Sequence, residues 1–143
     1  MPLSPLAVRD LIVARLRTQT NLDVIDGTVD ADGEPTYRLD ADGRIHMTAL
    51  LRIGAGTPVT ETEALDTTAA VHSLTWYVHA VGGDQDRCFK AHAKIRAALT
   101  GHRLAPTLGI TRELLEGAYV PIREAEPAPA RWSIPVLYRT ENG

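Results

Sequence analysis

One stretch of the sequence, residues 72–101, constrains the fold more than any other. Its first part alternates apolar and polar residues with a period of two, which is typical of a β-strand with one buried face. The apolar positions of this expected strand are Leu74, Trp76, Val78 and Ala80. Two glycines, Gly82 and Gly83, follow and allow a tight reversal into the next element.

Apolar residues then recur at helical spacing. Asp84 or Gly83 can cap the start of a helix, and Asp86 in its first turn suits the positive end of the helix dipole. Gly101 stands where a left-handed residue ends such a helix. The positions on its expected buried face are Cys88, Ala91, His92, Ile95, Ala98 and Leu99. Residues 72–101 therefore predict a strand, a tight turn and a helix that lies on a sheet.

Residues 4–18 predict a second helix. Ser4 can cap its free amides, and Pro5 sits where its missing N–H costs nothing. Four apolar residues share one face at the helical period: Val8, Leu11, Ile12 and Leu16. We expect this face to pack on the sheet as well.

Three segments between the helices favour further strands. Residues 22–30 alternate loosely around Asp26-Gly27 and predict one short strand with a turn or bulge. Residues 36–40 and 45–54, separated by Asp42-Gly43, predict two strands of an antiparallel meander. The second of these is expected to bury Met47, Ala49, Leu51 and Ile53.

Two longer segments lack a clear period. Residues 54–70 concentrate Gly, Thr, Pro and acids and predict a long loop or arm, for which ordered contact with a neighbour and simple mobility are equally open. Residues 104–130 predict an irregular segment with one short strand within 118–124. Residues 131–140 alternate again, and Pro135, which cannot donate a ladder hydrogen bond, favours an edge position or a bulge.

Length and composition complete the expected fold. With 143 residues and 44% hydrophobic content, the chain suits one domain, residues 1–143. The fold class is therefore α+β: a mostly antiparallel sheet packed by two main helices, in a single domain with a long loop or arm. No apolar run approaches the roughly 18 residues that cross a bilayer, so we expect no membrane role. A single cysteine and the lack of a charged-then-apolar leader indicate a chain kept in a reducing cytosol.

The charges are unevenly distributed along the chain. The formal net charge of -3 gives no reason to expect a nucleic-acid-binding protein. Residues 21–70, however, carry ten acidic and three basic side chains, whereas residues 71–103 carry two acidic and five basic ones. Complementary faces of a self-assembling ring need such a division, and solvated surface charge explains it equally well.

No set of residues predicts catalysis or a bound cofactor. The histidines lack zinc-site spacing, and His72 and His79 fall on opposite faces of their strand. Cys88 follows Arg87 near a helix start, where a thiol can become a nucleophile, yet its place on the apolar face favours a buried structural cysteine. Asp84 is explained by capping. We therefore expect no catalytic, metal or cofactor-binding residue.

Three basic residues, Arg87, Lys90 and Lys94, lie at i, i+3 and i+7 of the second helix, away from its apolar face. The simpler interpretation is a solvated face. The alternative is a charged contact with the acidic residues 21–70 of an adjacent copy, which would guide register more than add affinity. We expect no series of aromatic residues beside these charges for base stacking, which disfavours DNA readout.

The order of elements resembles the tail terminator, or tail completion, proteins of long-tailed actinobacterial phages (siphoviruses). The resemblance rests on the N-terminal helix RDLIVARLRTQ, the meander with its long arm, the strand WYVHAVGGDQDRC that runs into KAHAKIRAALTG, and the closing strand RWSIPVLYR. It covers nearly the whole chain and is sharpest at VGGDQDRC. Residues 54–70 and 104–130 are too irregular to contribute.

The resemblance implies a structural virion protein and no enzymatic reaction. Such a protein forms a ring, expected to contain six subunits, that caps the tail tube and ends its elongation at the head-proximal end of the tail. Its partners would be further copies of itself, the major tail tube protein and the head–tail connector or stopper protein, while DNA passes through the channel without sequence-specific binding. By analogy, the candidate interface residues are Arg87, Lys90, Lys94, Thr60, Glu61 and Glu63. The chain would be made in the host cytoplasm.

Two other functions stay open at this point. One is a different head–tail neck component, such as a stopper or an adaptor, which differs from a terminator in where its ring sits. The other is a small cytosolic thiol enzyme built on Cys88. Replacement of Cys88 by alanine distinguishes the second from a structural role.

Overall fold

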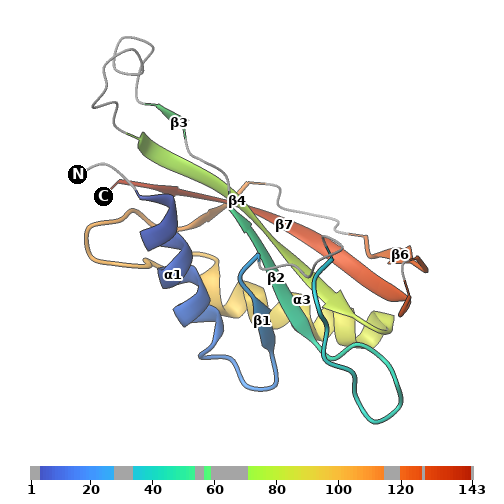
Figure 1. Cartoon of the computed structure of the whole chain (residues 1–143). Helices are drawn as coiled ribbons and strands as arrows, with labels where there is room; N and C mark the ends of the chain where they lie inside the picture. The colour runs from blue at the N-terminus through green and yellow to red at the C-terminus, as the bar shows by residue number, and fades with distance from the viewer. Residues whose placement is uncertain are drawn as a thin grey trace.

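The computed structural model describes residues 4–27, 34–53, 57–58, 71–114, 120–126 and 128–142. Within them the chain forms an α+β fold, with a mixed β-sheet and two helices, as the sequence predicts (Figure 1). The helices are α1 (Pro5–Leu16) and α3 (Gln85–Leu99). The strands are β1 (Asp23–Ile25), β2 (Thr48–Ile53), β3 (Thr57–Pro58), β4 (Val71–Gly82), β5 (Arg112–Glu113), β6 (Ile122–Glu124) and β7 (Arg131–Glu141).

The sheet has the strand order β1-β2-β4-β7-β5, with β3 also paired to β4 and β6 also paired to β7. All of these pairs are antiparallel except β1 with β2, which is parallel. The long strands β4 and β7 form its centre, in register from Ser73 opposite Glu141 to Gly82 opposite Trp132. This pair supplies the rigid base on which the other elements are placed.

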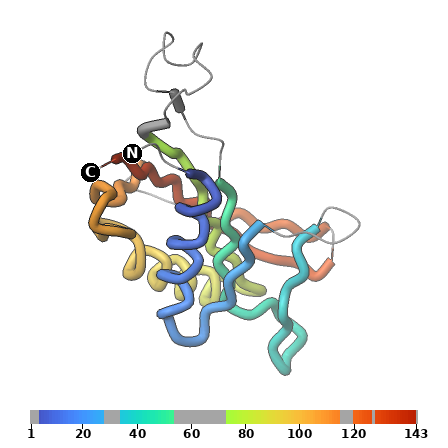
Figure 2. The backbone as a smooth tube through the Cα atoms, turned by 60° about the vertical axis from the view of Figure 1, so that its left-hand side comes forward, coloured from blue at the N-terminus to red at the C-terminus, as the bar shows by residue number. Residues whose placement is uncertain are grey.

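Both helices pack on one face of the sheet, where they also contact each other (Figures 1 and 2). Burial follows the predicted alternation along β4, because Leu74, Trp76 and Val78 are all fully buried. The expected helix face of α3 is also buried, at Cys88, Ala91, Ile95, Ala98 and Leu99, and His92 is half-buried. The predicted packing of the helix on the sheet is confirmed.

Helix α1 begins as the sequence predicts. The Ser4 hydroxyl accepts a hydrogen bond from the Ala7 amide at 3.3 Å, and Pro5 occupies the first turn. Its buried residues are Val8, Ile12, Val13 and Leu16. Leu11, expected on the same face, is partly buried against the core.

The β4–α3 junction depends on two glycines that allow close backbone approach. A Cβ on Gly82 would lie 2.6 Å from the Cys88 nitrogen, and one on Gly83 would lie 2.5 Å from the Ile45 nitrogen. Asp84 caps α3, since its carboxylate accepts the Arg87 amide at 2.7 Å. Gly101 has the left-handed backbone expected after the helix, with φ of 78°.

The expected strand at residues 36–40 is wrong. Only one isolated bridge forms there, between Leu39 and Ile45. Strand β2 is already paired on both sides, with β1 and with β4, and no edge is left for a meander strand. Tyr37 packs instead on a small second cluster formed by Ile45, Leu50 and Val81.

The predicted edge position of the closing strand is also wrong. Strand β7 pairs with β4 on one side and with β5 and β6 on the other. The Leu137 carbonyl accepts a hydrogen bond from the Leu114 amide on the β5 side, so the nitrogen of Pro135 faces that side too. The described pairings of β6 end at Ser133 and those of β5 end at Tyr138, so none of these described pairs needs a hydrogen-bond donor from Pro135.

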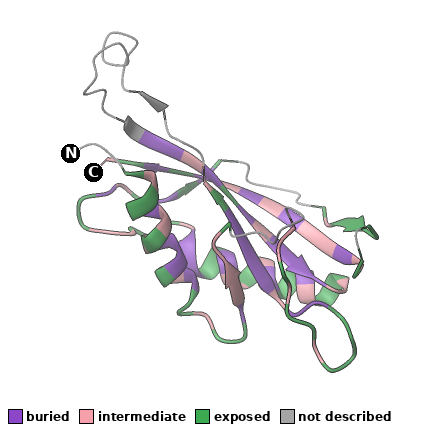
Figure 3. Ribbon diagram, in the orientation of Figure 1, coloured by how far each residue is buried: buried purple, intermediate pink, exposed green. Residues whose placement is uncertain are grey.

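The two irregular segments are described only in part. The expected short strand within 118–124 is confirmed as β6, which is exposed along its length (Figure 3). Strand β5 was not expected from the sequence. Of the predicted arm at 54–70, the described residues are those of β3, and the rest lie outside the described part of the chain.

Candidate functional site

The face of the sheet opposite the helices is a surface that no described helix covers. Alternation puts Thr75, Tyr77 and His79 of β4 on this face. Tyr77 is 43% exposed, and its ring stacks beside that of His79 with centroids 6.2 Å apart. A large aromatic side chain on an open sheet face is typical of a contact surface.

One end of this face is closed by the segment around Tyr37. Arg131, only 9% exposed, lies over the Tyr37 ring at 5.8 Å and pairs with Glu124 at 3.0 Å. Together with Arg52 and His79 these residues line a hollow of about 120 Å³. Burial raises the pKa of Tyr37, whereas burial and the nearby Arg52 lower the pKa of His79. Burial thus disfavours the charged form of both side chains.

Three basic side chains lie along the same face, and Arg52 among them also borders the hollow. Arg52 of β2 lies opposite Tyr77, and Arg139 of β7 lies opposite both Thr75 and Arg112. All three arginines are exposed. Like charges directly across a ladder are unfavourable, so the Arg112–Arg139 pair favours an external negative charge.

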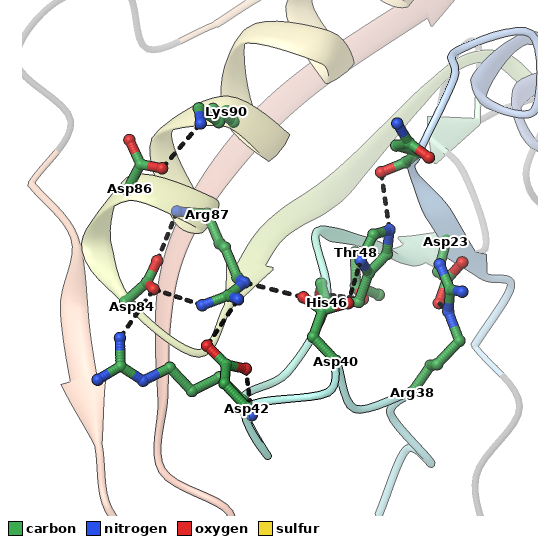
Figure 4. Close-up of polar contacts among 12 residues, drawn as sticks. Asp23, Arg38, Asp40, Asp42, His46, Thr48, Asp84, Asp86, Arg87 and Lys90 are labelled. Carbon is green, nitrogen blue, oxygen red and sulfur yellow. Dashed lines mark hydrogen bonds and ion pairs between the residues drawn. The ribbon is translucent and has the colours of Figure 1, made fainter.

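Arg87 occupies a different place from the one that the sequence suggested. Its guanidinium reaches from α3 into the 38–46 segment of the same chain, where Nε lies 2.9 Å from Asp40 and a terminal nitrogen lies 2.8 Å from Asp42 (Figure 4). It also pairs with Asp84, which in turn pairs with Arg44 at 3.1 Å. The acidic partner expected in an adjacent copy is thus present within the chain.

His46 completes this ionic cluster. It is 8% exposed, with Nδ1 at 2.9 Å from an Asp40 oxygen and Nε2 at 3.0 Å from the Asn21 carbonyl. Both ring nitrogens thus face acceptors. The cluster of Arg44, His46, Arg87 and the three aspartates joins the 38–46 segment to the start of α3.

The other candidate interface residues are more accessible. Lys90 is exposed and pairs with Asp86 one helical turn away at 2.9 Å, and the Lys94 ammonium donates to the Thr20 carbonyl at 2.6 Å. Phe89, 47% exposed beside them, is an apolar contact candidate that charge spacing alone did not single out. The remaining three, Thr60, Glu61 and Glu63, lie outside the described residues.

The ionic cluster should make stability depend on acid pH. Burial acts to raise the pKa of Asp40, but hydrogen bonds from His46 and Arg87 outweigh it and lower the pKa. Burial likewise acts to raise the pKa of Asp84, and hydrogen bonds from Arg87 and Arg44 outweigh it. The Arg44 amide and then Arg87 lower the pKa of Asp42. All three values fall below the ordinary 3.8. A carboxylate whose pKa is lower in the folded than in the unfolded chain stabilises the fold at pH values above its unfolded pKa. We expect that contribution to be lost as the pH drops below 3.8.

Replacement of Arg87 by methionine tests this dependence. We expect Arg87→Met to lower the melting temperature at pH 7 and to flatten its fall below pH 4, because the aspartates lose the charge that lowers their pKa. Lys90→Met is the matched control on the same helix, since its pair with Asp86 is fully on the surface. If the melting temperatures of wild type and Arg87→Met fall in parallel below pH 4, the pH dependence does not come from the aspartates that pair with Arg87.

Cys88 is placed as a structural residue. It is fully buried, its thiol donates to the Ala80 carbonyl at 3.4 Å, and burial raises its pKa to about 12. A shift from 9.0 to about 12 means roughly a thousandfold less thiolate at pH 7. We expect a thiol reagent to modify the native protein at least about a hundredfold more slowly than the urea-unfolded chain. Equal rates in the two states would restore the case for a reactive thiol.

No group of three or more His, Cys, Asp or Glu side chains within the described part of the chain is arranged to hold a metal ion. None of the described helices has the length and apolarity of a membrane-spanning segment. Comparison with models of known protein families and with curated proteins gives no match to this sequence.

Proposed function

We propose that this protein is a structural virion protein whose copies form a closed ring on the head-proximal end of a phage tail tube. The ring ends tube elongation and then joins the tail to the head-side connector. The observation that carries the proposal is the division of the fold into a packed framework and an open sheet face. On that face Tyr77 and exposed arginines have no covering helix among the described residues.

The two residues considered for an active centre, Cys88 and Asp84, have structural roles. Cys88 packs between α3 and the sheet with a protonated thiol, and Asp84 caps that helix and pairs with arginines. The proposed function therefore depends on surfaces that bind partners. The resemblance of the VGGDQDRC junction to tail terminator proteins supplies the kind of partner: further copies, the tube protein and the connector.

A closed ring needs two different surfaces on each subunit, because its contacts are head-to-tail. We assign one to the outward face of α3, which carries Phe89, Lys90 and Lys94. Arg87 of the same helix forms ion pairs with Asp40 and Asp42 of its own chain and so helps to fix the position of α3. At the other contact, the open sheet face of one copy would meet the 54–70 arm of the next copy, and DNA would pass through the channel without being read.

Tube growth in the presence of the purified chain tests the proposal. We expect added protein to bind one end of growing tubes of the cognate tail tube protein and to stop their elongation, which electron microscopy measures as shorter tubes with one capped end. The Cys88→Ala variant should cap tubes equally well, since the thiol has only a packing role. Binding to the connector without any effect on tubes would identify a stopper or adaptor instead. Loss of capping in a folded Cys88→Ala variant would contradict the role assigned to the thiol.

A further inference from the structure

The open patch, which we define as Arg52, Tyr77, Arg112, Leu137 and Arg139, is a continuous surface on the helix-free face. Ladder register places these residues side by side: Tyr77 is opposite Arg52 on one strand and Leu137 on another. Arg139 follows Leu137 on the same face and is opposite Arg112. The patch thus combines three positive charges with an aromatic and an aliphatic side chain.

Arg52 borders a hollow that Glu34 and Glu124 also line, but few of the described carboxylates form ion pairs with the three arginines. Among the described residues neither Arg52 nor Arg112 forms an ion pair, and both are exposed. Arg139 has a carboxylate near it only in Glu141, at 4.0 Å, and both side chains are about half exposed. Such a surface is complementary to an acidic segment that also carries an apolar residue.

The chain itself contains a segment of that chemistry. Residues 59–70 include Glu61, Glu63 and Asp66 together with Leu65, and no basic residue. The segment connects β3 to β4, whose last described pair is Pro58 with Val71. That pair is at the end of β4 farthest from the turn that leads into α3 (Figure 1).

We infer that the open patch of one copy binds residues 59–70 of a second copy. The inference rests on the proposed function, because a head-to-tail ring is the assembly in which each copy offers a segment to one neighbour and receives one from the other. Glu61 and Glu63 pair with the arginines, and Leu65 covers Tyr77 and Leu137. The positive patch sets the register of each junction and makes assembly sensitive to salt.

A peptide probe tests the pairing without requiring a ring. The host is the full chain with Glu61→Lys and Glu63→Lys, which cannot fill the patch with its own acidic segment, and the probe is a fluorescent peptide of residues 57–72. We expect binding that weakens with salt and that falls about tenfold or more in a host also carrying Arg112→Glu and Arg139→Glu. The control host carries Arg17→Glu and Arg123→Glu instead, the same charge change at exposed residues outside the patch.

Equal binding to the patch variant and to the control host would overturn the inference. So would tighter binding of a short DNA duplex than of the peptide, since the patch would then be a phosphate-binding surface. A peptide with lysine at positions 61 and 63 should prefer the host with the reversed patch. This exchange of preference is a result that mere loss of folding does not produce.

Mixing of variants distinguishes contact between copies from contact within one copy. Chains with the reversed segment and chains with the reversed patch should each fail to assemble alone but assemble together, because every junction in the mixture then joins opposite charges. If wild type forms rings and the mixture does not, the inference fails and the proposed function stands. If the peptide binds as expected but no rings form under any condition, only the proposed function fails.

Discussion

Replacement of Trp76 by alanine is expected to lower the free energy of unfolding by about 3–5 kcal/mol. Trp76 is fully buried at the centre of β4, and its ring stacks on that of Tyr138 with centroids 4.7 Å apart. Its indole N–H donates to the Thr140 hydroxyl at 3.0 Å. The change removes all three contributions and leaves a cavity between the sheet and the helices. Urea unfolding followed by circular dichroism measures the loss.

Trp76→Phe is the matched control for this prediction. It keeps an aromatic ring against Tyr138 and leaves the Thr140 hydroxyl without its donor, so we expect a smaller loss of about 1–3 kcal/mol. A loss below about 1 kcal/mol for Trp76→Ala would mean that the β4–β7 pair is not the centre of the core.

Replacement of Gly83 by alanine is the second large effect that we expect, with a loss of about 1–3 kcal/mol. The new methyl carbon would lie 2.5 Å from the Ile45 nitrogen and 2.5 Å from the Arg44 Cβ. Backbone atoms of another segment cannot move aside cheaply, and the Gly83 amide already donates to the Ile45 carbonyl at 2.9 Å. The strain should also loosen the ionic cluster, because Arg44 belongs to it.

Gly109→Ala controls for the general effect of adding a methyl group. Its backbone φ is not positive, and the nearest atom to a new Cβ is the Glu141 carbonyl oxygen at 3.4 Å. We expect a change within about 1 kcal/mol, partly offset by the lower entropy of the unfolded chain. Thermal unfolding of the two variants should therefore differ clearly, and equal melting temperatures would contradict the close approach at Gly83.

Local signals in the sequence were enough to predict the framework. Ser4 and Asp84 cap the two helices, and the alternation around Trp76 identifies the buried face of β4. These features depend on residues near one another in the chain, where side-chain period and capping chemistry decide the structure. The core of the fold was therefore predictable.

Long-range pairing accounts for what the sequence did not predict. Residues 36–40 have strand-forming composition, but the parallel pairing of β1 fills the edge of β2 that they would need. Pro135 lies within a strand paired on both sides, and the described pairs of β5 and β6 do not include it. Neither the pairing of β1 with β2 nor the pairing of the strand around Pro135 can be predicted from local composition.

The candidate surfaces were only partly predictable for the same reason. Lys90 and Lys94 were selected by helical spacing and lie on the outside of α3. Arg87 was selected on the same basis, but the segment that supplies Asp40 and Asp42 folds against it. The juxtaposition of Arg112 with Arg139 required knowledge of β5, a strand of two residues that no sequence period indicates.

The central claim is that the chain assembles into a closed ring, and images of the purified full chain test it most directly. Negative-stain class averages should be collected over a range of protein concentrations, with and without isolated tail tubes. We predict closed rings with sixfold symmetry, free at high concentration or bound at one end of the tubes. Single subunits at every concentration, with bare tube ends throughout, would contradict the account.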